Sequence, residues 1–234
     1  MIISVILSFL LSVLMWVCPV ILYTIISKKE LKEKYNKLWL FINRFTLDRK
    51  LNVNKNICFG FTLFCGRQGG GKTYTAVKYC VDIAKKYNSL FISNTPLNLD
   101  KSIDYVYIKD ISEIKYIIQE NRQNVILLDE IQTLFDSKDF DKEFYSIFCQ
   151  LRKRNIKLVG TAQVFERCAL KLREQVHNLY YCKTYFGCLT RYREYYPVLS
   201  SGGKLSQKNS FGLGDKFIVQ NEYIRNTYNT YFKI

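Results

Sequence analysis

The sequence predicts an α/β fold with a mostly parallel sheet, preceded by one apolar N-terminal helix and followed by a β-rich C-terminal extension. Three observations support this prediction. A glycine-rich stretch at 66–73 stands between an apolar run and a segment with helical apolar spacing, which is typical of a strand, a loop and a helix. The apolar run 125–128 continues into two acids, as a strand buried on both faces does at its end. Residues 2–26 carry no charge, which is typical of a membrane-spanning helix.

The glycine-rich stretch reads GRQGGGKT and fits the pattern G-x-x-x-x-G-K-[ST] at every fixed position. In such a phosphate-binding loop, glycines turn backbone N–H groups toward phosphate oxygens, the lysine reaches the β- and γ-phosphates, and the hydroxyl ligates Mg²⁺. The strand is expected over 59–65 and the helix, whose positive end adds to the anion site, over 74–87. The alternative is a coincidental glycine-rich turn. The candidate nucleotide-binding residues are Gly66, Arg67, Gln68, Gly69, Gly70, Gly71, Lys72, Thr73 and Tyr74. Lys72 is also a candidate catalytic residue, and Thr73 a candidate metal ligand.

Two acids follow the apolar run 125–128, and we expect them at the carboxyl edge of the sheet, where open α/β sheets place their ligands. Asp129 is suited to holding the Mg²⁺ shell, and Glu130 to polarising the attacking water. A further strand is expected over 90–94. A capping-box-like start predicts a helix from Asp110.

The next predicted strand, 156–161, ends in Ala162-Gln163. A polar residue at the tip of the strand beside the acidic one can sense the γ-phosphate or orient water, so Gln163 is a candidate catalytic residue, with a structural role as the alternative. Arg152 and Arg154 precede this strand. They could reach a neighbouring subunit's site and stabilise transition-state charge, or contact nucleic-acid phosphates. Both interpretations stay open for these two arginines.

The uncharged run 2–26 predicts a membrane anchor. A helix of this length would reach roughly 37 Å, enough to cross a ~30 Å hydrocarbon core. Four lysines follow it at once, and the positive-inside rule therefore places the N-terminus outside and residues 28–234 in the cytoplasm, as a single-pass protein of the host inner or cell membrane. The alternative is a buried core helix. The predicted organisation is an anchor at 1–27, a basic and aromatic linker at 28–57, a P-loop core at 58–187 and an extension at 188–234.

The linker has aromatic residues at near-helical spacing, and could lie along the membrane interface or contact the core. In the extension, strands are expected on either side of residues 186–188 as a hairpin, with one more strand over 216–220. Aromatic and basic residues alternate over 192–196, which suits stacking on single-stranded bases. Ordinary packing of aromatic residues within a sheet is the alternative.

The chain has a net charge of +15, with basic residues crowded over 28–50 and 152–193. This balance favours an anionic partner such as nucleic acid or a membrane surface, although solubility alone is an alternative. The 8 cysteines include no C-x-x-C pair and the only histidine is His177, which argues against a zinc site. We expect reduced thiols that mostly pack in the core.

Four motifs carry a resemblance to a known family: GRQGGGKTY, SNTPL, VILLDEIQTLF and LRKRNIKLVGTAQ. With them, residues 66–183 resemble the zonula occludens toxin-like (Zot) ATPases, which include the assembly ATPases of filamentous phages, within the wider FtsK/HerA group of DNA-pumping motors. Residues 165–177 resemble the family's helix before the last core strand. In one departure, the phage proteins generally carry their membrane span after the ATPase domain, whereas here the predicted span comes first.

The resemblance implies a RecA-like parallel sheet, ATP and Mg²⁺, an oligomer at the inner face of a membrane, and export of single-stranded viral DNA. It implies phosphate and metal binding by Gly66, Gly71, Lys72 and Thr73, hydrolysis by Asp129 and Glu130, and a sensor role for Gln163.

Together these observations favour a membrane-anchored, oligomeric ATPase that drives assembly, extrusion or packaging of DNA for a filamentous phage or related mobile element. Its expected partners are copies of itself, single-stranded DNA or a nucleoprotein complex, and other phage assembly proteins. One alternative is a conjugative coupling-type DNA translocase, although such motors are usually much longer. A second is a nucleotide-switched membrane scaffold, which would have no need of Glu130. A small-molecule kinase explains neither the anchor nor the basic excess.

Overall fold

The computed structural model describes residues 18, 29–54, 58–135, 142–200, 202–206 and 211–228. The chain divides into two compact units, Met1–Asn56 and Ile57–Ile234, and each is described by itself. Apart from Cys18, the predicted membrane segment 2–26 lies outside the described residues. Among the helices that are described, none combines the length and the apolar character that crossing a membrane requires.

In the first unit, the predicted linker is helical over most of its length, as α2 (Lys29–Asn54). Along 35–47 its large apolar side chains are all at least 48% exposed. Two of them, Phe41 and Phe45, stack with ring centroids 6.0 Å apart, as side chains one helical turn apart can. The exposed apolar residues of α2 are Tyr35, Leu38, Trp39, Leu40, Phe41, Ile42, Phe45 and Leu47. Placement of this helix at a membrane interface stays a prediction.

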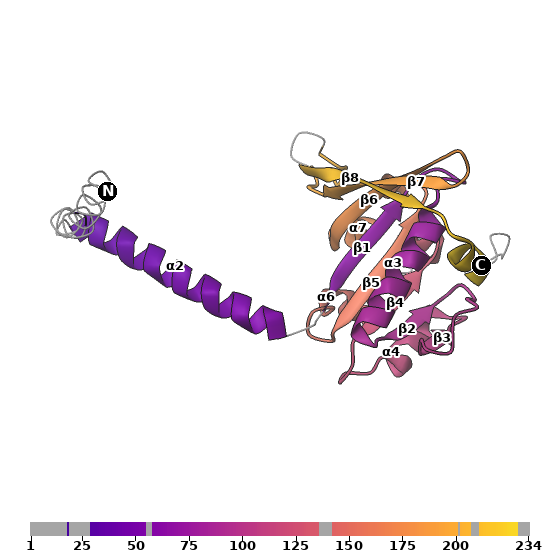
Figure 1. Cartoon of the computed structure of the whole chain (residues 1–234), viewed down its shortest axis with the longest axis horizontal. Helices are drawn as coiled ribbons and strands as arrows, with labels where there is room; N and C mark the ends of the chain where they lie inside the picture. Colours follow the sequence, from indigo (N-terminus) through magenta and orange to yellow (C-terminus); the bar gives the residue numbers. More distant parts are fainter. Residues whose placement is uncertain are drawn as a thin grey trace, which may run out of the picture. The chain divides into compact units, whose positions relative to one another are not determined.

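The second unit is built on one sheet, whose described strands lie in the order β3-β2-β4-β5-β1-β6-β7-β8 (Figure 1). The strands from β3 to β6 pair in parallel, whereas β7 and β8 are antiparallel additions. The strand bounds are β1 Gly60–Cys65, β2 Leu90–Ser93, β3 Tyr105–Tyr107, β4 Asn124–Leu128, β5 Ile156–Ala162, β6 Val176–Tyr185, β7 Leu189–Tyr196 and β8 Phe211–Val219. This mostly parallel α/β arrangement confirms the sheet of the predicted fold class, whereas its N-terminal membrane-spanning helix lies outside the described residues, apart from Cys18, and stays a prediction.

Strand β5 lies between β1 and β4, with Phe64 opposite Thr161 and Leu127 opposite Val159. The strand that enters the glycine-rich loop and the strand that ends in the acids are therefore separated by one strand. Because all three are parallel, their carboxyl ends meet at one edge of the sheet. That edge positions the candidate site.

Helices cover both faces of the sheet. Their bounds are α3 Lys72–Tyr87, α4 Ile114–Ile117, α5 Ile131–Leu134, α6 Lys142–Cys149, α7 Leu170–Arg173 and α8 Glu222–Thr227, with short 3₁₀ turns at Ile111–Glu113 and Phe165–Arg167. Helix α3 lies along one face (Figure 1), and α8 contacts it. Apolar residues of α6 and α7 belong to the cluster on the other face.

Strands β6 and β7 form the predicted hairpin, and β8 pairs with β7. The hairpin turn has positive φ at both central residues, 51° at Phe186 and 68° at Gly187, as a type I′ turn requires. Such a turn matches the right-handed twist of the strands that it joins. The described strands of the extension 188–234 thus continue the sheet of the core instead of forming a separate unit.

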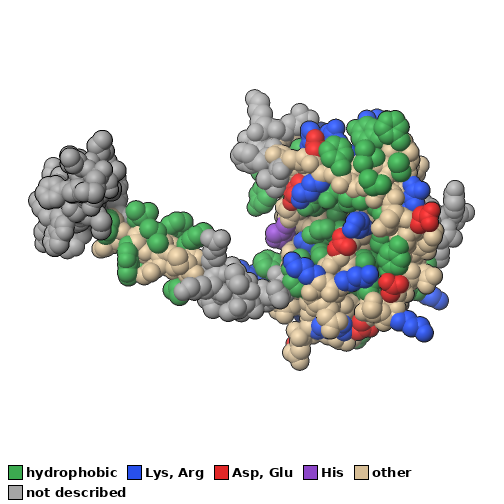
Figure 2. Space-filling view, viewed as in Figure 1, with side chains coloured by type: hydrophobic (Ala, Val, Ile, Leu, Met, Phe, Trp, Pro, Cys, Tyr) green, Lys and Arg blue, Asp and Glu red, His purple; other side chains and the backbone are tan. Residues whose placement is uncertain are grey.

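Several basic side chains of β7 and β8 form ion pairs with acids of the neighbouring strand. Arg193 donates two hydrogen bonds to Asp215, at 2.6 and 2.9 Å, and Lys216 pairs with Glu194 at 2.8 Å. Figure 2 shows Lys and Arg side chains dispersed over the visible face of the second unit, among apolar and acidic ones. On that face the basic excess does not gather into one patch.

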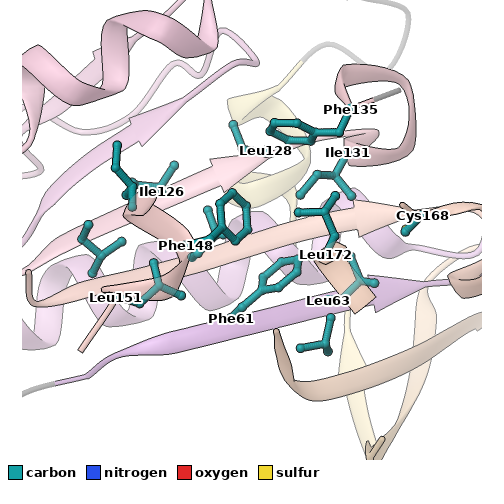
Figure 3. Packing of buried hydrophobic residues seen from close by; sticks show 14 of the residues in the cluster. Phe61, Leu63, Ile126, Leu128, Ile131, Phe135, Phe148, Leu151, Cys168 and Leu172 are labelled. Carbon is teal, nitrogen blue, oxygen red and sulfur yellow. The ribbon is translucent and has the colours of Figure 1, made fainter. Parts of the chain in front are cut away.

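The core consists of one apolar cluster on each face of the sheet. Successive residues of β1 point to opposite faces, because the side-chain period of a strand is two. Phe61 therefore meets Phe148 of α6 edge-on at 5.5 Å (Figure 3), whereas Phe64 stacks on Tyr180 at 4.9 Å. Four cysteines are buried in these clusters: Cys65, Cys80, Cys168 and Cys182. Three others, Cys18, Cys149 and Cys188, are exposed, so packing in the core holds for only part of the cysteines.

Short helices form in the two segments where helices are predicted, from Asp110 and over 165–177. The capping box at Asp110 is present, with Ser112 N–H donating to its carboxylate and Glu113 accepting from its N–H, each at 3.1 Å. The helix ends at Ile117, because the buried side chain of Asn124 bonds both backbone groups of Gln119 and holds the chain extended. The helix predicted over 165–177 was wrong in extent, since only the turn Phe165–Arg167 and α7 form before β6 begins at Val176.

Candidate nucleotide-binding site

The glycine-rich loop joins β1 to α3 and runs close against strands β6 and β7. A Cβ on Gly66 would lie 2.5 Å from the carbonyl oxygen of Cys182, and one on Gly71 would lie 2.6 Å from the hydroxyl of Thr184. Gly71 also has φ of 78°, a conformation that favours glycine. Gly69 has φ of 70°, and a Cβ there would meet no atom within 4 Å, so this part of the loop faces open space. Gly66 and Gly71 therefore allow the loop to lie against β6 and β7, while the open side at Gly69 is free to face a ligand.

Lys72 begins helix α3 and is buried, with only 9% of its surface exposed. Its ammonium group donates to the carbonyl oxygen of Arg67 at 3.2 Å, and the N–H of Gly70 donates to the same oxygen at 2.9 Å. Arg67 and Gln68 are exposed at the outer side of the loop. The lysine is therefore held over the loop by a neutral acceptor, with its charge available to an anion.

The two candidate metal ligands lie together. The hydroxyl of Thr73 donates to Oδ1 of Asp129 at 3.1 Å, although the two residues are 56 positions apart. A hydroxyl and a carboxylate at this separation form an oxygen donor set of the kind that Mg²⁺ prefers. The residues present therefore fit a divalent cation beside the phosphate loop.

Two buried polar side chains hold Asp129 in place, and sequence reasoning assigned a role to neither. Asn94 accepts from the N–H of Asp129 at 2.8 Å and donates to its carbonyl oxygen at 3.2 Å. Thr161, at the end of β5, donates to Oδ1 of Asp129. The SNTPL motif at the end of β2 contains this asparagine, and its place at the carboxyl edge was the available signal.

Glu130 adopts a left-handed backbone conformation, with φ of 50° and ψ of 48°. A non-glycine residue in this region costs on the order of 1 kcal/mol, and such residues cluster at functional sites. Its N–H donates to the hydroxyl of Thr161 at 2.9 Å, and its carbonyl oxygen accepts from the N–H and the hydroxyl of Thr133, each at 2.8 Å. The hydroxyl of Thr161 thus links the backbone of Glu130 to the carboxylate of Asp129.

Gln163 follows β5 at the same edge of the sheet, between the strands of the loop and of the acids. Arg152 and Arg154 instead precede β5, at the opposite edge. There the guanidinium of Arg152 lies 5.5 Å from the ring centroid of Phe59, and Nε of Arg154 donates to Gln150 at 3.2 Å. The structure does not bring these two arginines to the loop of their own chain, and a role in a neighbouring subunit stays a prediction.

A pocket of about 410 Å³ opens beside the loop. The loop and the start of α3 line one part of it, and residues from the hairpin and the C-terminal segment line the rest. Burial, and then the negative charge of Asp129, raise the pKa of Tyr228 to about 12, so its hydroxyl stays protonated at neutral pH. The lining residues are Gly69, Gly71, Lys72, Thr73, Tyr74, Thr184, Gly187, Gln220, Arg225 and Tyr228. The last five were not predicted, because no local motif marks them.

A family model described as zonular occludens toxin (Zot) matches residues 61–212, more than half of the chain. The chain belongs to the Zot family. The matched span runs from β1 into β8 and includes the loop, both acids and the hairpin of this Zot-family chain. No match was found among curated proteins.

Among solved structures, the Zot-family chain is similar to the N-terminal domain of zonular occludens toxin from Neisseria meningitidis. The TM-score is 0.53 at 14% identity, over 73% of this chain and 98% of that one, which shows a shared fold. It is also similar to the genome packaging NTPase B204 from Sulfolobus turreted icosahedral virus 2 in complex with ATP-gammaS, with a TM-score of 0.44 and 15% identity, over 54% of this chain and 76% of that one.

Proposed function

We propose that this Zot-family protein is an ATP hydrolase whose site lies at the carboxyl edge of the sheet. The observation that carries the proposal is the 3.1 Å contact between the hydroxyl of Thr73 and Asp129, beside a glycine loop with a buried lysine. Thr73 and Asp129 would hold Mg²⁺, which neutralises developing phosphate charge when bound. The two residues come from different elements and are 56 positions apart, so only the folded chain brings them together.

Each remaining residue has a stated role in the proposed reaction. The backbone N–H groups of the loop and Lys72 bind the phosphates. Glu130 polarises the attacking water, and its left-handed backbone is held by Thr161. Gln163 senses the γ-phosphate from the strand between the loop and the acids. Phosphoryl transfer needs chiefly such positioning and electrostatic stabilisation.

At a finer level, we propose a membrane-anchored, oligomeric motor that moves single-stranded DNA or a nucleoprotein complex for a filamentous phage or related mobile element. Family membership supports this, as do the uncharged run 2–26, the lysines after it and the net charge of +15. The N-terminus would lie outside and the site in the cytoplasm, where ATP is available. Other phage assembly proteins are proposed partners.

Only some tyrosines of the strand over 192–196 are accessible enough to stack on bases. Tyr192 lies against Tyr180, and Tyr195 against Tyr181, each pair with ring centroids 5.6 Å apart. For these two residues the geometry favours packing within the sheet over stacking on bases. Tyr196 is 56% exposed and is the better candidate on this strand.

The test uses the purified full-length chain in detergent. We expect Mg²⁺-dependent ATP hydrolysis that single-stranded DNA stimulates, and DNA affinity that falls steeply with salt as counterions are released. Lys72→Ala should abolish hydrolysis while the circular dichroism spectrum stays unchanged. Near-normal turnover of this variant would overturn the proposed site. Hydrolysis without DNA binding or stimulation would overturn the motor, and favour a nucleotide-switched scaffold.

A further inference from the structure

The C-terminal strap, residues 220–228, is fixed against the start of α3 and beside the glycine loop. The N–H of Asn221 donates to the hydroxyl of Tyr74 at 2.9 Å, and its side chain caps α8 by accepting from Ile224 N–H at 3.0 Å. Ile224 is buried in the core cluster on the α3 face. At the far end, Asn98 N–H donates to the carbonyl oxygen of Thr227 at 2.7 Å. These contacts anchor the strap at both ends.

One basic side chain of the strap, Arg225, lines the pocket beside the loop. Its Nε donates to Oε1 of Gln220 at 2.9 Å, and its Nη2 donates to the carbonyl oxygen of Gly187 in the hairpin turn. Both acceptors are neutral. Within the described part of the chain, no carboxylate forms an ion pair with Arg225.

The carboxylate of Asp129 lies beside the pocket, hydrogen-bonded to the hydroxyl of Thr73, but the charged side chains that line the pocket itself are both basic. Lys72 and Arg225 both line it, and none of its lining residues in the described ranges is an aspartate or a glutamate. Lys72 is likewise held by a neutral carbonyl oxygen, that of Arg67. Two cations held only by neutral acceptors favour a polyanion between them, since hydrogen bonds from an ionised donor to phosphate are about twice as strong as neutral ones.

We propose that Arg225 binds the polyphosphate of the nucleotide, so that the strap completes the nucleotide site of its own chain; this inference rests on the function proposed above. The planar guanidinium carries five N–H donors, and the two hydrogen bonds to Gln220 and Gly187 leave others for phosphate oxygens. The strap thus places an arginine at the nucleotide site of its own chain. Arg152 and Arg154 do not reach that site.

The competing explanation is structural: Arg225 ties the hairpin turn to the strap and nothing more. Arg225→Gln and Arg225→Lys together separate the two, because glutamine keeps N–H donors without a charge. Arg225→Lys keeps a charge without the planar fork. Asn226→Ala, an exposed change on the same helix, controls for α8, and Lys153→Met removes a positive charge at the opposite edge of the sheet.

The experiment titrates the full-length chain in detergent with a fluorescent ATP analogue and records thermal unfolding. We expect Arg225→Gln to weaken binding about tenfold or more, because a charge-assisted hydrogen bond is typically worth about 1.5–3 kcal/mol. Arg225→Lys should recover part of the loss, and both controls should stay within about twofold. Inorganic tripolyphosphate should compete with the analogue, and about tenfold less well in Arg225→Gln.

The outcomes separate this inference from the proposed function. If Lys72→Ala loses binding and Arg225→Gln does not, the strap is structural and the inference is overturned, while the nucleotide site stands. If neither variant loses binding, both this inference and the proposed function are overturned. A third outcome is that Arg225→Lys loses as much affinity as Arg225→Gln, with the unfolding temperature lowered equally in both variants. That result would assign Arg225 a structural role alone.

Discussion

Asn94 holds the backbone of Asp129 by two reciprocal hydrogen bonds, of 2.8 and 3.2 Å, across two neighbouring strands. The asparagine follows β2, and the acid follows β4. Because Asn94 is almost completely buried, water cannot replace either bond. The position of Asp129, the proposed metal ligand, therefore depends on a residue that follows another strand.

Asn94→Ala should reduce ATP hydrolysis about tenfold or more and destabilise the fold by about 1–3 kcal/mol, because buried backbone groups of Asp129 lose their partners. Apparent Mg²⁺ affinity should fall with the rate, measured by titrating Mg²⁺ at saturating ATP. Asn98→Ala, an exposed change on the same loop, is the matched control. Wild-type Mg²⁺ dependence in Asn94→Ala would show that the carboxylate of Asp129 keeps its position without Asn94.

Glu130→Gln should bind ATP nearly normally and hydrolyse it at least a hundredfold more slowly, since Thr73 and Asp129 remain and only the water-polarising carboxylate is lost. A binding titration and a single-turnover assay measure the two effects separately. Glu120→Gln removes an exposed acid outside the site and should change neither. Normal hydrolysis by Glu130→Gln would show that Glu130 does not polarise the attacking water.

Thr161→Val should slow hydrolysis and lower stability by about 1–3 kcal/mol, because the buried hydroxyl serves both Asp129 and the N–H of Glu130. Denaturant unfolding and turnover assays check the two parts. Thr95→Val is the matched control, since the buried hydroxyl of Thr95 has no hydrogen-bond partner among the described residues. Equal effects of the two changes would mean that the hydrogen bonds of the Thr161 hydroxyl contribute nothing specific to stability or turnover.

A reporter fused after Ile234 tests the proposed topology. A reporter that is active only in the cytoplasm should work, and one that needs export should stay inactive, because lysines follow the uncharged run 2–26. Replacing Lys28, Lys29, Lys32 and Lys34 by glutamine should weaken this bias. If only the export-dependent reporter works in the unaltered chain, the nucleotide site lies outside the cytoplasm and the proposed topology is wrong.

Much of the site could be predicted from local sequence. The glycine loop, the acids and the hairpin turn each depend on residues close together in the chain, where backbone conformation and chemistry are set by neighbours. Helix lengths were less predictable. The helix from Asp110 ends at Ile117, and Asn124, seven residues further along the chain, hydrogen-bonds the backbone of Gln119 just beyond that end. Such a contact depends on burial, which the local pattern does not contain.

The sequence by itself determined the phosphate loop, the acidic pair and the strands that carry them, because these follow from residue type and spacing along one segment. Only the tertiary structure decided which partners meet them: Asn94 and Thr161 at Asp129, and Arg225 beside Lys72. The physical reason is that strand order and register set distances between segments far apart in the chain. Because β5 runs parallel to β1 and β4, Arg152 and Arg154 before it lie at the far edge, whereas an arginine of the C-terminal strap lies beside the loop.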